Sequence, residues 1–475
     1  MPNPACIAVL GGGFSGAMTA VNVARISDRA LHVVVVDDRG SVGRGVAYSV
    51  RRPEYLLNVA ARNMSAFPDE PDHFLHWLRT RAEFEPLPEA ELREQFVPRQ
   101  VYGDYLRSIV GNHLCGDSHR PCVTTELITG EAVDIEPGDG HCLVRMADGS
   151  AIAAEKIVLA TGNEPPARLP GASALDDHPA WVANPWQQWE HRVPAAGSIA
   201  ILGTGLSAVD AIITLCDLGW QGSIHAISRH GWLPHAHFRG IEYPEFPPAG
   251  VDLVTLGLND LRRLVSQHCA ELVARDADPA IIVDKLRPYT QRIWGNFSRE
   301  ERLEFARRDA ARWNVLRHRI APEIHDQVMH ARRTGALQIH AGSIEELQAV
   351  DGTIRIGIEA REPVVADLVI NATGPSTRFS ATRNVLLRNL LARGLVSPDD
   401  TDMGIRIDLD HTVVDAQGDR SASLLALGPT LRGTYWETVA VPELRVQARR
   451  VAETLLGAVP VDVEEEGQLR LEYML

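Results

Sequence analysis

The sequence predicts an α/β protein in which two similar strand–loop–helix units form separate domains. A glycine-rich loop joins an apolar strand to a helix within residues 7–25, and the same arrangement recurs within residues 198–215. Two further apolar strands, within residues 156–162 and 367–374, each end in Ala-Thr-Gly. The chain has 475 residues, which is too long for one ordinary domain and predicts two or three.

The first unit has the residue order of a Rossmann-like βαβ motif, which binds a dinucleotide. Residues 7–10 are an apolar run that predicts a buried parallel strand, and Gly11-Gly12-Gly13-Phe14-Ser15-Gly16 follows directly. Gly11 would permit the tight turn, Gly13 would let the backbone approach a pyrophosphate, and Gly16 would let the helix pack closely on the strand. The free N–H groups of the first helical turn, at Phe14 and Ser15, would face the phosphates.

The strand that follows this helix strengthens the assignment. Residues 31–36 are apolar and lead into Asp37, which stands 26 residues after Gly11. An acidic residue near this offset binds a ribose hydroxyl in dinucleotide-binding domains. Because strand, glycine loop, helix, strand and acid occur in this order, we predict a dinucleotide site rather than a glycine-rich turn without a ligand.

The second unit predicts another dinucleotide site with a different preference. Residues 198–202 form an apolar strand, and Gly203-Thr204-Gly205-Leu206-Ser207-Ala208 replaces the third glycine by alanine, which the motif allows. The next strand ends in Ser228 and Arg229, where an NAD site carries an acid. An arginine pairs with a 2′-phosphate and an acid repels it, so NADPH is favoured over NADH. The alternative is that Arg229 only ends a strand in solvent.

Composition and charge exclude several other classes. The net charge of −15 argues against general binding to nucleic acid or to anionic lipid. No run of eighteen apolar residues predicts a membrane span, and the start of the chain has no basic, apolar leader, so we expect a cytoplasmic protein. The six cysteines form no CxxC pair and no metal-binding spacing, so we expect reduced structural thiols and no metal site.

The two glycine loops and the two Ala-Thr-Gly strands together resemble the two-dinucleotide-binding-domain flavoproteins. Among these, the chain is most similar to single-component flavin monooxygenases of the flavin-containing, Baeyer–Villiger and amine N-hydroxylating types, and to bacterial relatives described only as FAD-NAD(P)-binding. The resemblance implies a glutathione-reductase-like α/β fold. It implies an FAD domain formed by residues 1–190 and 366–475, into which an NAD(P) domain of residues 191–365 is inserted.

The resemblance also implies which residues contact the cofactors. Gly43-Arg44-Gly45 matches a turn beside the flavin, and Asn58 matches the asparagine that hydrogen-bonds the flavin adduct, with Asn63 as its rival. Asn63 could instead cap the helix expected at residues 72–78. The remaining cofactor contacts implied by the family lie in the two Ala-Thr-Gly strands and in the C-terminal segment, at Ala160, Thr161, Gly162, Thr373, Gly374, Gly428 and Pro442.

One segment departs from the family pattern. Related monooxygenases carry FxGxxxHxxxW between the first Ala-Thr-Gly strand and the second glycine loop, whereas here Gly171, His178 and Trp181 recur at other spacings. This departure affects the oxygenase assignment more than the cofactor assignment, and His178 could equally be a loop residue at the surface.

Helical periodicity dominates residues 251–335, which predicts a mostly helical insert in the NAD(P) domain. Within it, residues 312–319 hold three arginines and a histidine. This cluster could bind an anionic group, either the cofactor 2′-phosphate or a substrate carboxylate. Alternatively, it could be a solvated helix face beside acids such as Glu323 and Asp326.

These features predict an NADPH-using, FAD-dependent monooxygenase that acts through a C4a-hydroperoxyflavin on a small nucleophile, with O2 as co-substrate. Amine N-hydroxylation is favoured because many members of the resembled family perform it. The alternatives are a flavin oxidoreductase that passes electrons to another acceptor, and a flavin-binding protein without redox turnover. The sequence gives no indication of the oligomeric state.

Overall fold

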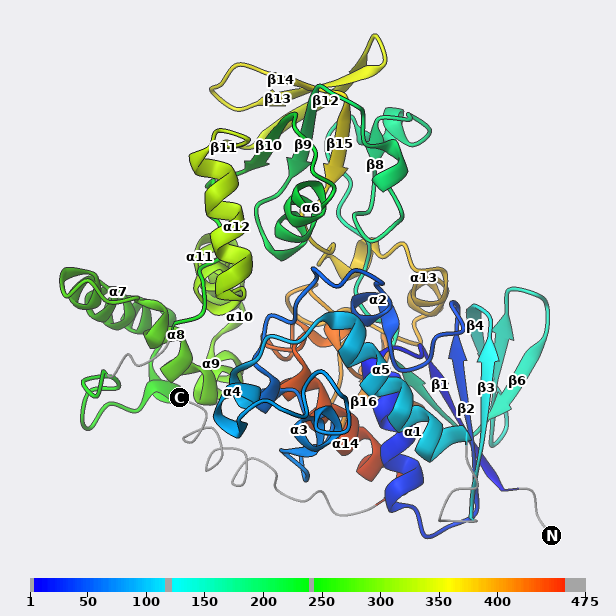
Figure 1. Ribbon diagram of the computed structural model, residues 1–475. Helices are drawn as coiled ribbons and strands as arrows, with labels where there is room; N and C mark the ends of the chain where they lie inside the picture. The colour runs from blue at the N-terminus through cyan, green and yellow to red at the C-terminus, as the bar shows by residue number, and fades with distance from the viewer. Residues whose placement is uncertain (1–3, 116–121, 239–242, 458–475) are drawn as a thin grey trace.

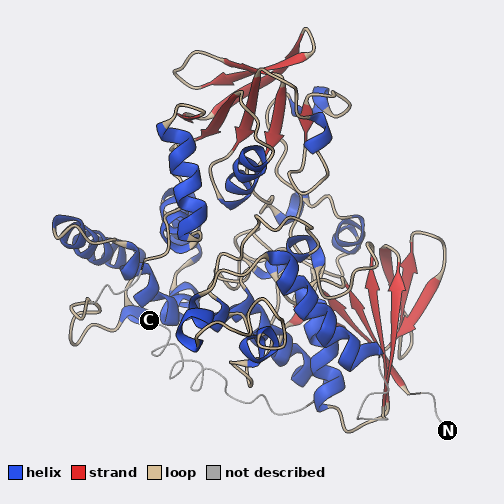
Figure 2. Ribbon diagram, viewed as in Figure 1, coloured by secondary structure: helices blue, strands red, loops and turns tan. Residues whose placement is uncertain are grey.

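The computed structural model describes residues 4–115, 122–238 and 243–457. Figure 1 shows two lobes, each built on a mainly parallel sheet, and a group of helices beside them. Figure 2 shows the same arrangement by secondary structure, with the strands gathered in an upper and a lower group. Among the described residues, no helix combines the length and the apolar character needed to span a bilayer.

The first lobe contains a six-stranded sheet in the order β16-β17-β7-β1-β2-β3. All neighbours pair in parallel except β16 and β17. Its strands are β1 (Ala5–Leu10), β2 (Leu31–Asp37), β3 (Val123–Thr129), β7 (Lys156–Leu159), β16 (Thr412–Val414) and β17 (Arg420–Ala426). The near-continuous valines of β2 are buried because helices cover a parallel sheet.

Three helices pack together on this sheet. Helix α1 (Phe14–Ile26) joins β1 to β2 and contacts both α5 (Arg99–Val110) and α14 (Val441–Leu456). Their apolar side chains form one core with the central strands. A small antiparallel sheet, β4 (Ala132–Pro137), β5 (Cys142–Met146) and β6 (Ala151–Ala154), lies beside them with α13 (Val385–Ala392) against β4. The start of α1 therefore lies where the N-terminal and C-terminal segments meet.

The second lobe contains a five-stranded parallel sheet in the order β11-β10-β9-β15-β8. Its strands are β8 (Trp181–Val182), β9 (Ser198–Leu202), β10 (Ser223–Ser228), β11 (Leu337–Ala341) and β15 (Leu368–Asn371). Helix α6 (Leu206–Asp217) joins β9 to β10. An antiparallel sheet of β12 (Ile344–Val350), β13 (Thr353–Ile358) and β14 (Val364–Ala366) lies next to it.

The boundaries of the two sheets differ from the division expected at residues 190 and 365. The expected division places strands β8 and β15 in the first lobe, but both strands pair in parallel within the second sheet. An apolar run that ends in Ala-Thr-Gly fits either sheet, because the two sheets share the same strand pattern. The strands with which each strand pairs determine the sheet to which it belongs, and one sequence does not show these partners.

The insert is helical, in agreement with the prediction, and its helices reach both lobes. Its elements are α7 (Leu258–Ala274), α8 (Ala280–Leu286), α9 (Thr290–Asn296), α10 (Arg299–Arg308), α11 (Ala310–Arg317) and α12 (Pro322–Arg333). Helix α12 packs on α6 in the second lobe. The other helices form a separate core that includes Trp436 of the first lobe. The insert is therefore a third body that contacts the C-terminal segment.

Candidate functional site

The first glycine loop forms a strand-to-helix corner in which two glycines are required by close contacts. Gly11 has φ +111°, and a Cβ atom there would lie 2.2 Å from the carbonyl oxygen of Ala160. A Cβ atom at Gly16 would lie 1.9 Å from the carbonyl oxygen of Gly11. The strand that carries the first Ala-Thr-Gly therefore passes directly against the turn, and α1 packs tightly on β1.

The start of α1 is open to a ligand. Gly13 is the N-cap residue, no side chain caps the helix, and its first turn has no acidic residue. Phe14 and Ser15 are buried within this turn. The backbone of Gly45 lies beside Gly13, and a Cβ atom at Gly428 would approach the Ser15 hydroxyl at 3.2 Å. The structure thus brings four separately predicted segments together around uncapped N–H groups, which suit a pyrophosphate.

Asp37 ends β2 next to this corner. One of its carboxylate oxygens, Oδ1, accepts hydrogen bonds from the N–H groups of Arg39 and Ser41 at 3.1 and 3.0 Å. A Cβ atom at Gly12 would lie 2.9 Å from the other oxygen, Oδ2. The backbone therefore fixes the carboxylate beside the glycine loop, in the position expected for binding a ribose.

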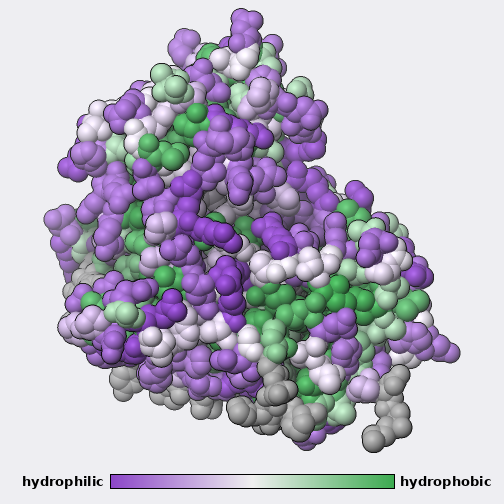
Figure 3. Space-filling view, turned by 45° about the vertical axis from the view of Figure 1, so that its right-hand side comes forward, coloured by the Kyte–Doolittle hydropathy of each residue, from purple (hydrophilic) through white to green (hydrophobic). Residues whose placement is uncertain are grey.

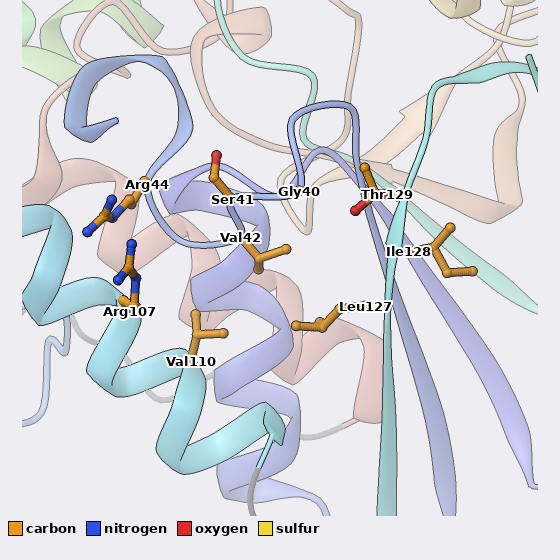
Figure 4. Close-up of a pocket in the computed structure, with 9 residues that line it drawn as sticks. All are labelled: Gly40, Ser41, Val42, Arg44, Arg107, Val110, Leu127, Ile128 and Thr129. Atoms are coloured by element: carbon orange, nitrogen blue, oxygen red, sulfur yellow. The ribbon is translucent and has the colours of Figure 1, made fainter. Parts of the chain in front are cut away.

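A cavity of about 340 Å³ extends from the ends of β2 and β3. Figure 4 shows the side chains of Arg44 and Arg107 on one side of it and those of Leu127 and Thr129 on the other. Leu127 is 38% exposed, and the lower lobe carries a hydrophobic area on its surface in Figure 3. Apolar walls beside a fixed acid and two cations suit the adenosine half of a dinucleotide. Arg107 and Leu127 were missed from the sequence, because no motif marks the residues that β3 places beside β2.

Arg44 is held in place at the edge of this cavity. Its guanidinium pairs with Asp104 and donates to the carbonyl of Gly103 at 3.3 Å. A Cβ atom at Gly103 would lie 2.4 Å from the carbonyl oxygen of Tyr48, so α5 packs tightly against this turn. Arg44 and Gly45 therefore adjoin the first corner.

Several buried polar atoms near this corner have no hydrogen-bond partner among the described residues. They are Thr161 Oγ1, Asn63 Oδ1, Tyr102 OH and Arg445 Nε. Arg445 donates to the carbonyl of Ser65 at 3.0 Å, which links α14 to the segment around Asn63. Buried polar groups without a partner are costly, so a polar ligand such as a flavin fits here.

The two candidate asparagines lie in different surroundings. The backbone carbonyl of half-buried Asn58 accepts a hydrogen bond of 2.9 Å from His237 Nε2, and its side-chain amide bonds to no described residue. Asn63 has a buried, unpartnered oxygen. It does not cap α3 (His73–Leu78), whose N-cap residue is Asp72. The capping alternative for Asn63 is therefore wrong.

The second glycine loop repeats the geometry of the first. Gly203 has φ +116°, and a Cβ atom there would lie 2.3 Å from the carbonyl oxygen of Ala372. Gly205 is the N-cap residue of α6, no side chain caps this helix, and a Cβ atom at Gly205 would meet nothing within 4 Å. Leu206 and Ser207 form the start of α6 and are half-buried. The two corners are thus equivalent, each crossed by the alanine of an Ala-Thr-Gly strand.

Ser228 and Arg229 have different roles at the end of β10. The Ser228 hydroxyl bonds Thr204 Oγ1 at 2.8 Å and accepts from the N–H of Gly231 at 3.0 Å, so it holds the loop together. Arg229 is exposed and has no ion-pair or hydrogen-bond partner among the described residues. Its charge is therefore available to a phosphate.

The segments that follow the two Ala-Thr-Gly strands lie side by side where the chain crosses between lobes. Pro166 and Pro375 form an antiparallel bridge, and Ser376 donates its N–H to the carbonyl of Pro165 at 3.1 Å. Thr373 bonds Asn371 Oδ1 at 2.7 Å, and Gly374 has φ +85°. A second cavity of about 40 Å³ opens here, lined among others by Gly162, Pro375, Pro429 and Arg432.

The start of α14 is occupied by ion pairs from the insert. Pro442 lies in the first turn, followed by Glu443. Arg287 and Arg317 contact the Glu443 carboxylate at 2.9 and 3.4 Å. Burial raises the pKa of Glu443, and the two guanidinium groups lower it by more, so the pKa lies below its ordinary value.

The expectation of an anion site or a solvated face at residues 312–319 is therefore wrong for two of the three arginines. Arg317 is 7% exposed and also contacts Glu437 at 3.3 Å. Arg319 is 8% exposed and contacts Asp284 at 2.7 Å. Only Arg312 is exposed. Local acids in the sequence suggested the wrong partners, because these carboxylates lie on α8 and on the distant C-terminal segment.

Other candidates lie away from the corners. His178 Nδ1 accepts a hydrogen bond of 3.2 Å from the N–H of Ala180 and stabilises a local turn. The six cysteines, all in the described part of the chain, form no disulfide. No group of side chains suited to a metal ion occurs within the residues described.

Comparison with known proteins supports a dinucleotide-binding site at the first corner. Residues 8–164 match the protein family described as FAD-NAD(P)-binding, a match that includes the first corner. No curated protein matches the sequence.

Solved structures match over almost the entire chain. The ornithine N-hydroxylase of Kutzneria sp. 744, solved with reduced FAD, NADP+ and L-ornithine, has a TM-score of 0.62 and 16% identity, covering 98% of this chain and 100% of its own. The ornithine hydroxylase of Pseudomonas aeruginosa has a TM-score of 0.63 and 18% identity, covering 95% and 99%. The FAD-bound cadaverine monooxygenase of Erwinia amylovora has a TM-score of 0.64 and 13% identity, covering 96% of each chain.

These matches confirm the predicted fold class. The chain has a mixed α/β fold with parallel sheets, similar to that of two-domain FAD- and NADP-binding monooxygenases. At such identities the likeness is one of fold, and the reaction is a separate question.

Proposed function

We propose that this chain is an FAD-dependent, NADPH-using monooxygenase that transfers an oxygen atom from O2 to a small nucleophile, with amine N-hydroxylation favoured. The observation that carries the proposal is the pair of equivalent corners, each crossed by an alanine of an Ala-Thr-Gly strand, in a fold shared over nearly its whole length with amine hydroxylases.

We assign FAD to the first corner. The uncapped start of α1 would hold the pyrophosphate, Asp37 the adenosine ribose, and the 340 Å³ cavity the adenine. The orphaned polar atoms of Thr161, Asn63 and Arg445 would face the ribityl and ring portions. Bound FAD would supply the hydride-accepting and oxygen-activating chemistry, which the protein side chains do not supply themselves.

NADPH belongs to the second corner, because Arg229 is a free cation at the end of β10. Replacing Arg229 by Ala removes the contact to the 2′-phosphate alone. We expect the KM for NADPH to rise roughly ten-fold or more, with the KM for NADH nearly unchanged. An equal loss for both cofactors would refute the assignment.

Asn58 is the proposed catalytic residue. Its free side-chain amide would donate a hydrogen bond that keeps the oxygenated flavin from releasing peroxide. The backbone of Asn58 is held by His237, a half-buried residue whose ring has its pKa lowered to about 4 by desolvation and is therefore neutral at pH 7. A neutral imidazole that carries its proton on Nε2 can donate this bond throughout the working pH range.

Stopped-flow absorbance tests the proposal. The holoprotein is reduced anaerobically with NADPH and then mixed with O2. We expect the flavin to bleach and then to form an oxygenated species that persists for seconds, and Asn58→Ala to shorten its lifetime. Immediate return to oxidised flavin in the wild-type protein would favour the electron-transfer alternative. A flavin that NADPH does not bleach would refute both enzymatic functions.

A further inference from the structure

The 40 Å³ cavity between the lobes contains an arginine without a counter-charge. The cavity lies where the segments after Gly162, Gly374 and Gly428 meet, and Arg432 is part of its wall. The Arg432 Nε atom is buried, and among the residues that the structure describes it has no hydrogen-bond partner and the guanidinium has no carboxylate within 4 Å. The ring of Trp436 lies against the guanidinium, with its centroid 4.6 Å from the guanidinium carbon.

The nearest acid is already engaged by other residues. Glu437 accepts a hydrogen bond of 2.8 Å from Trp313 Nε1, and its other oxygen lies 3.3 Å from Arg317 Nε. Burial lowers the pKa of Arg432, and the attraction of Glu437 only partly opposes this. The other buried arginines of the insert interface, Arg317 and Arg319, each contact a carboxylate directly.

The other charged residues of the cavity wall already have hydrogen-bond or ion-pair partners. Glu164 accepts from the Thr382 hydroxyl and from the N–H of Arg383 at 3.2 Å. Arg378 is 76% exposed in its side chain and contacts Asp402 at 3.5 Å. The uncommitted charge in this cavity is therefore positive. A buried cation without an anion is costly, which indicates that an anionic group completes it.

We infer that Arg432 binds the carboxylate of the substrate, so that the chain acts on amines that carry a carboxylate rather than on simple diamines. This inference rests on the proposed monooxygenase function and names its substrate class. A space of about 40 Å³ admits a carboxylate group but not an entire substrate, so the rest of the molecule would extend toward the flavin. A planar guanidinium can form a two-point bond with a carboxylate, and the Trp436 ring lies against this one.

Two matched pairs of amines test the inference, because the members of each pair differ only in the α-carboxylate. They are L-lysine with cadaverine, and L-ornithine with putrescine. Binding to the oxidised holoprotein is measured from the change in flavin absorbance, and turnover from hydroxylamine formation. We expect the carboxylate-bearing member to bind at least about ten-fold more tightly in at least one pair.

Variants of Arg432, compared with a control arginine outside the cavity, separate this role from a structural one. Arg432→Gln should abolish the discrimination within the pair while FAD content and Tm stay near those of the wild-type protein. Arg432→Lys should restore part of the discrimination, because lysine carries the positive charge but lacks the planar guanidinium that forms two parallel hydrogen bonds. Arg145→Gln is the control and should leave the discrimination intact, because Arg145 is outside the cavity wall and forms an exposed ion pair with Glu136.

Three results would overturn the inference. The diamine could bind as tightly as the amino acid, neither member of either pair could bind, or Arg432→Gln could shift the flavin midpoint potential without changing the discrimination. The last result would assign the guanidinium to the reduced flavin instead. Failure of the proposed function is distinguishable, because it appears as a flavin that NADPH does not reduce, whereas the binding ratios are measured on the oxidised holoprotein.

Discussion

At the residue scale, the glycines of the two corners are of two kinds. Gly11 and Gly203 have positive φ angles, and a side chain there would strike a backbone carbonyl oxygen at 2.2 or 2.3 Å. Gly13 has no neighbour closer than 3.6 Å to its virtual Cβ atom, and Gly205 has none within 4 Å. The fold therefore requires the first kind, whereas only a bound dinucleotide would require the second.

This difference predicts separate effects of substitution. Gly13→Val should give a folded protein without FAD, and Gly205→Val a yellow protein whose flavin NADPH no longer reduces efficiently. Gly11→Ala should lower the free energy of unfolding by about 2 kcal/mol or more even without cofactor, because both φ and the contact with Ala160 forbid a side chain. FAD content follows from absorbance, and thermal unfolding is compared with FAD-stripped wild-type protein. Stoichiometric FAD in Gly13→Val would contradict the assignment of the first corner.

At the element scale, a buried ion pair fixes the two lobes to each other. Arg99, at the start of α5, contacts Asp210 of α6 through two hydrogen bonds of 2.8 and 2.9 Å. Its Nε donates to the carbonyl of Leu56 at 3.0 Å, two residues before Asn58. The Tyr55 and Thr214 hydroxyls add a bond of 2.7 Å between the segment that carries Leu56 and α6. Arg99 thus connects the helix of the second corner to the segment of the proposed catalytic asparagine.

Loss of the Arg99–Asp210 ion pair should therefore reduce the rate of hydride transfer more than the affinity for the cofactors. Arg99→Lys removes the two-point contact, and we expect the rate of flavin reduction by NADPH to fall roughly ten- to a hundred-fold through misalignment of the lobes. FAD content and the affinity for 2′,5′-ADP should stay near the wild-type values. Reduction by the small donor dihydronicotinamide mononucleotide serves as an internal reference. Arg145→Lys, at an exposed pair with Glu136, is the matched control. Equal slowing with both donors would argue against a positioning role.

The elements also mark the limits of prediction from this sequence. Both corners and the helical insert could be predicted, because each depends on local spacing or periodicity. The placement of β15 in the second sheet could not, since strands with the same pattern fit either sheet. The partners of Arg317 and Arg319, and the cavity that contains Arg432, depend on contacts between distant segments. Such contacts leave no local signal, so the most specific part of the candidate site required the structure.

At the scale of the whole molecule, three histidines, two of them half-buried and one buried, lie where desolvation affects their titration. His237 lies between the lobes, His318 between the insert and the C-terminal segment, and His411 within the first lobe. Burial lowers the pKa of each ring to about 4 from an ordinary value of 6.5. The charged groups that act on the first two rings are Asp284, Arg317, Arg319, Arg432, Glu437 and Glu443.

These histidines predict acid sensitivity in a defined window. Between pH 6.5 and about 4 the unfolded chain binds more protons than the folded one, so stability is complete above pH 6.5 and falls as the pH decreases toward 4. Each ring contributes a slope of at most about 1.4 kcal/mol per pH unit.

Denaturant midpoints of the holoprotein at half-unit intervals between pH 7.5 and 4.5 measure the slope. His318→Gln should flatten the profile, because a neutral amide replaces a ring that must be protonated on unfolding, whereas His141→Gln, at an exposed site, should not. Carboxylates in ion pairs add to the loss mainly at the acidic end of this range, so the difference between the two variants above pH 5 isolates the histidine contribution. Parallel profiles for both variants and the wild-type protein would exclude His318 as a source of the acid sensitivity.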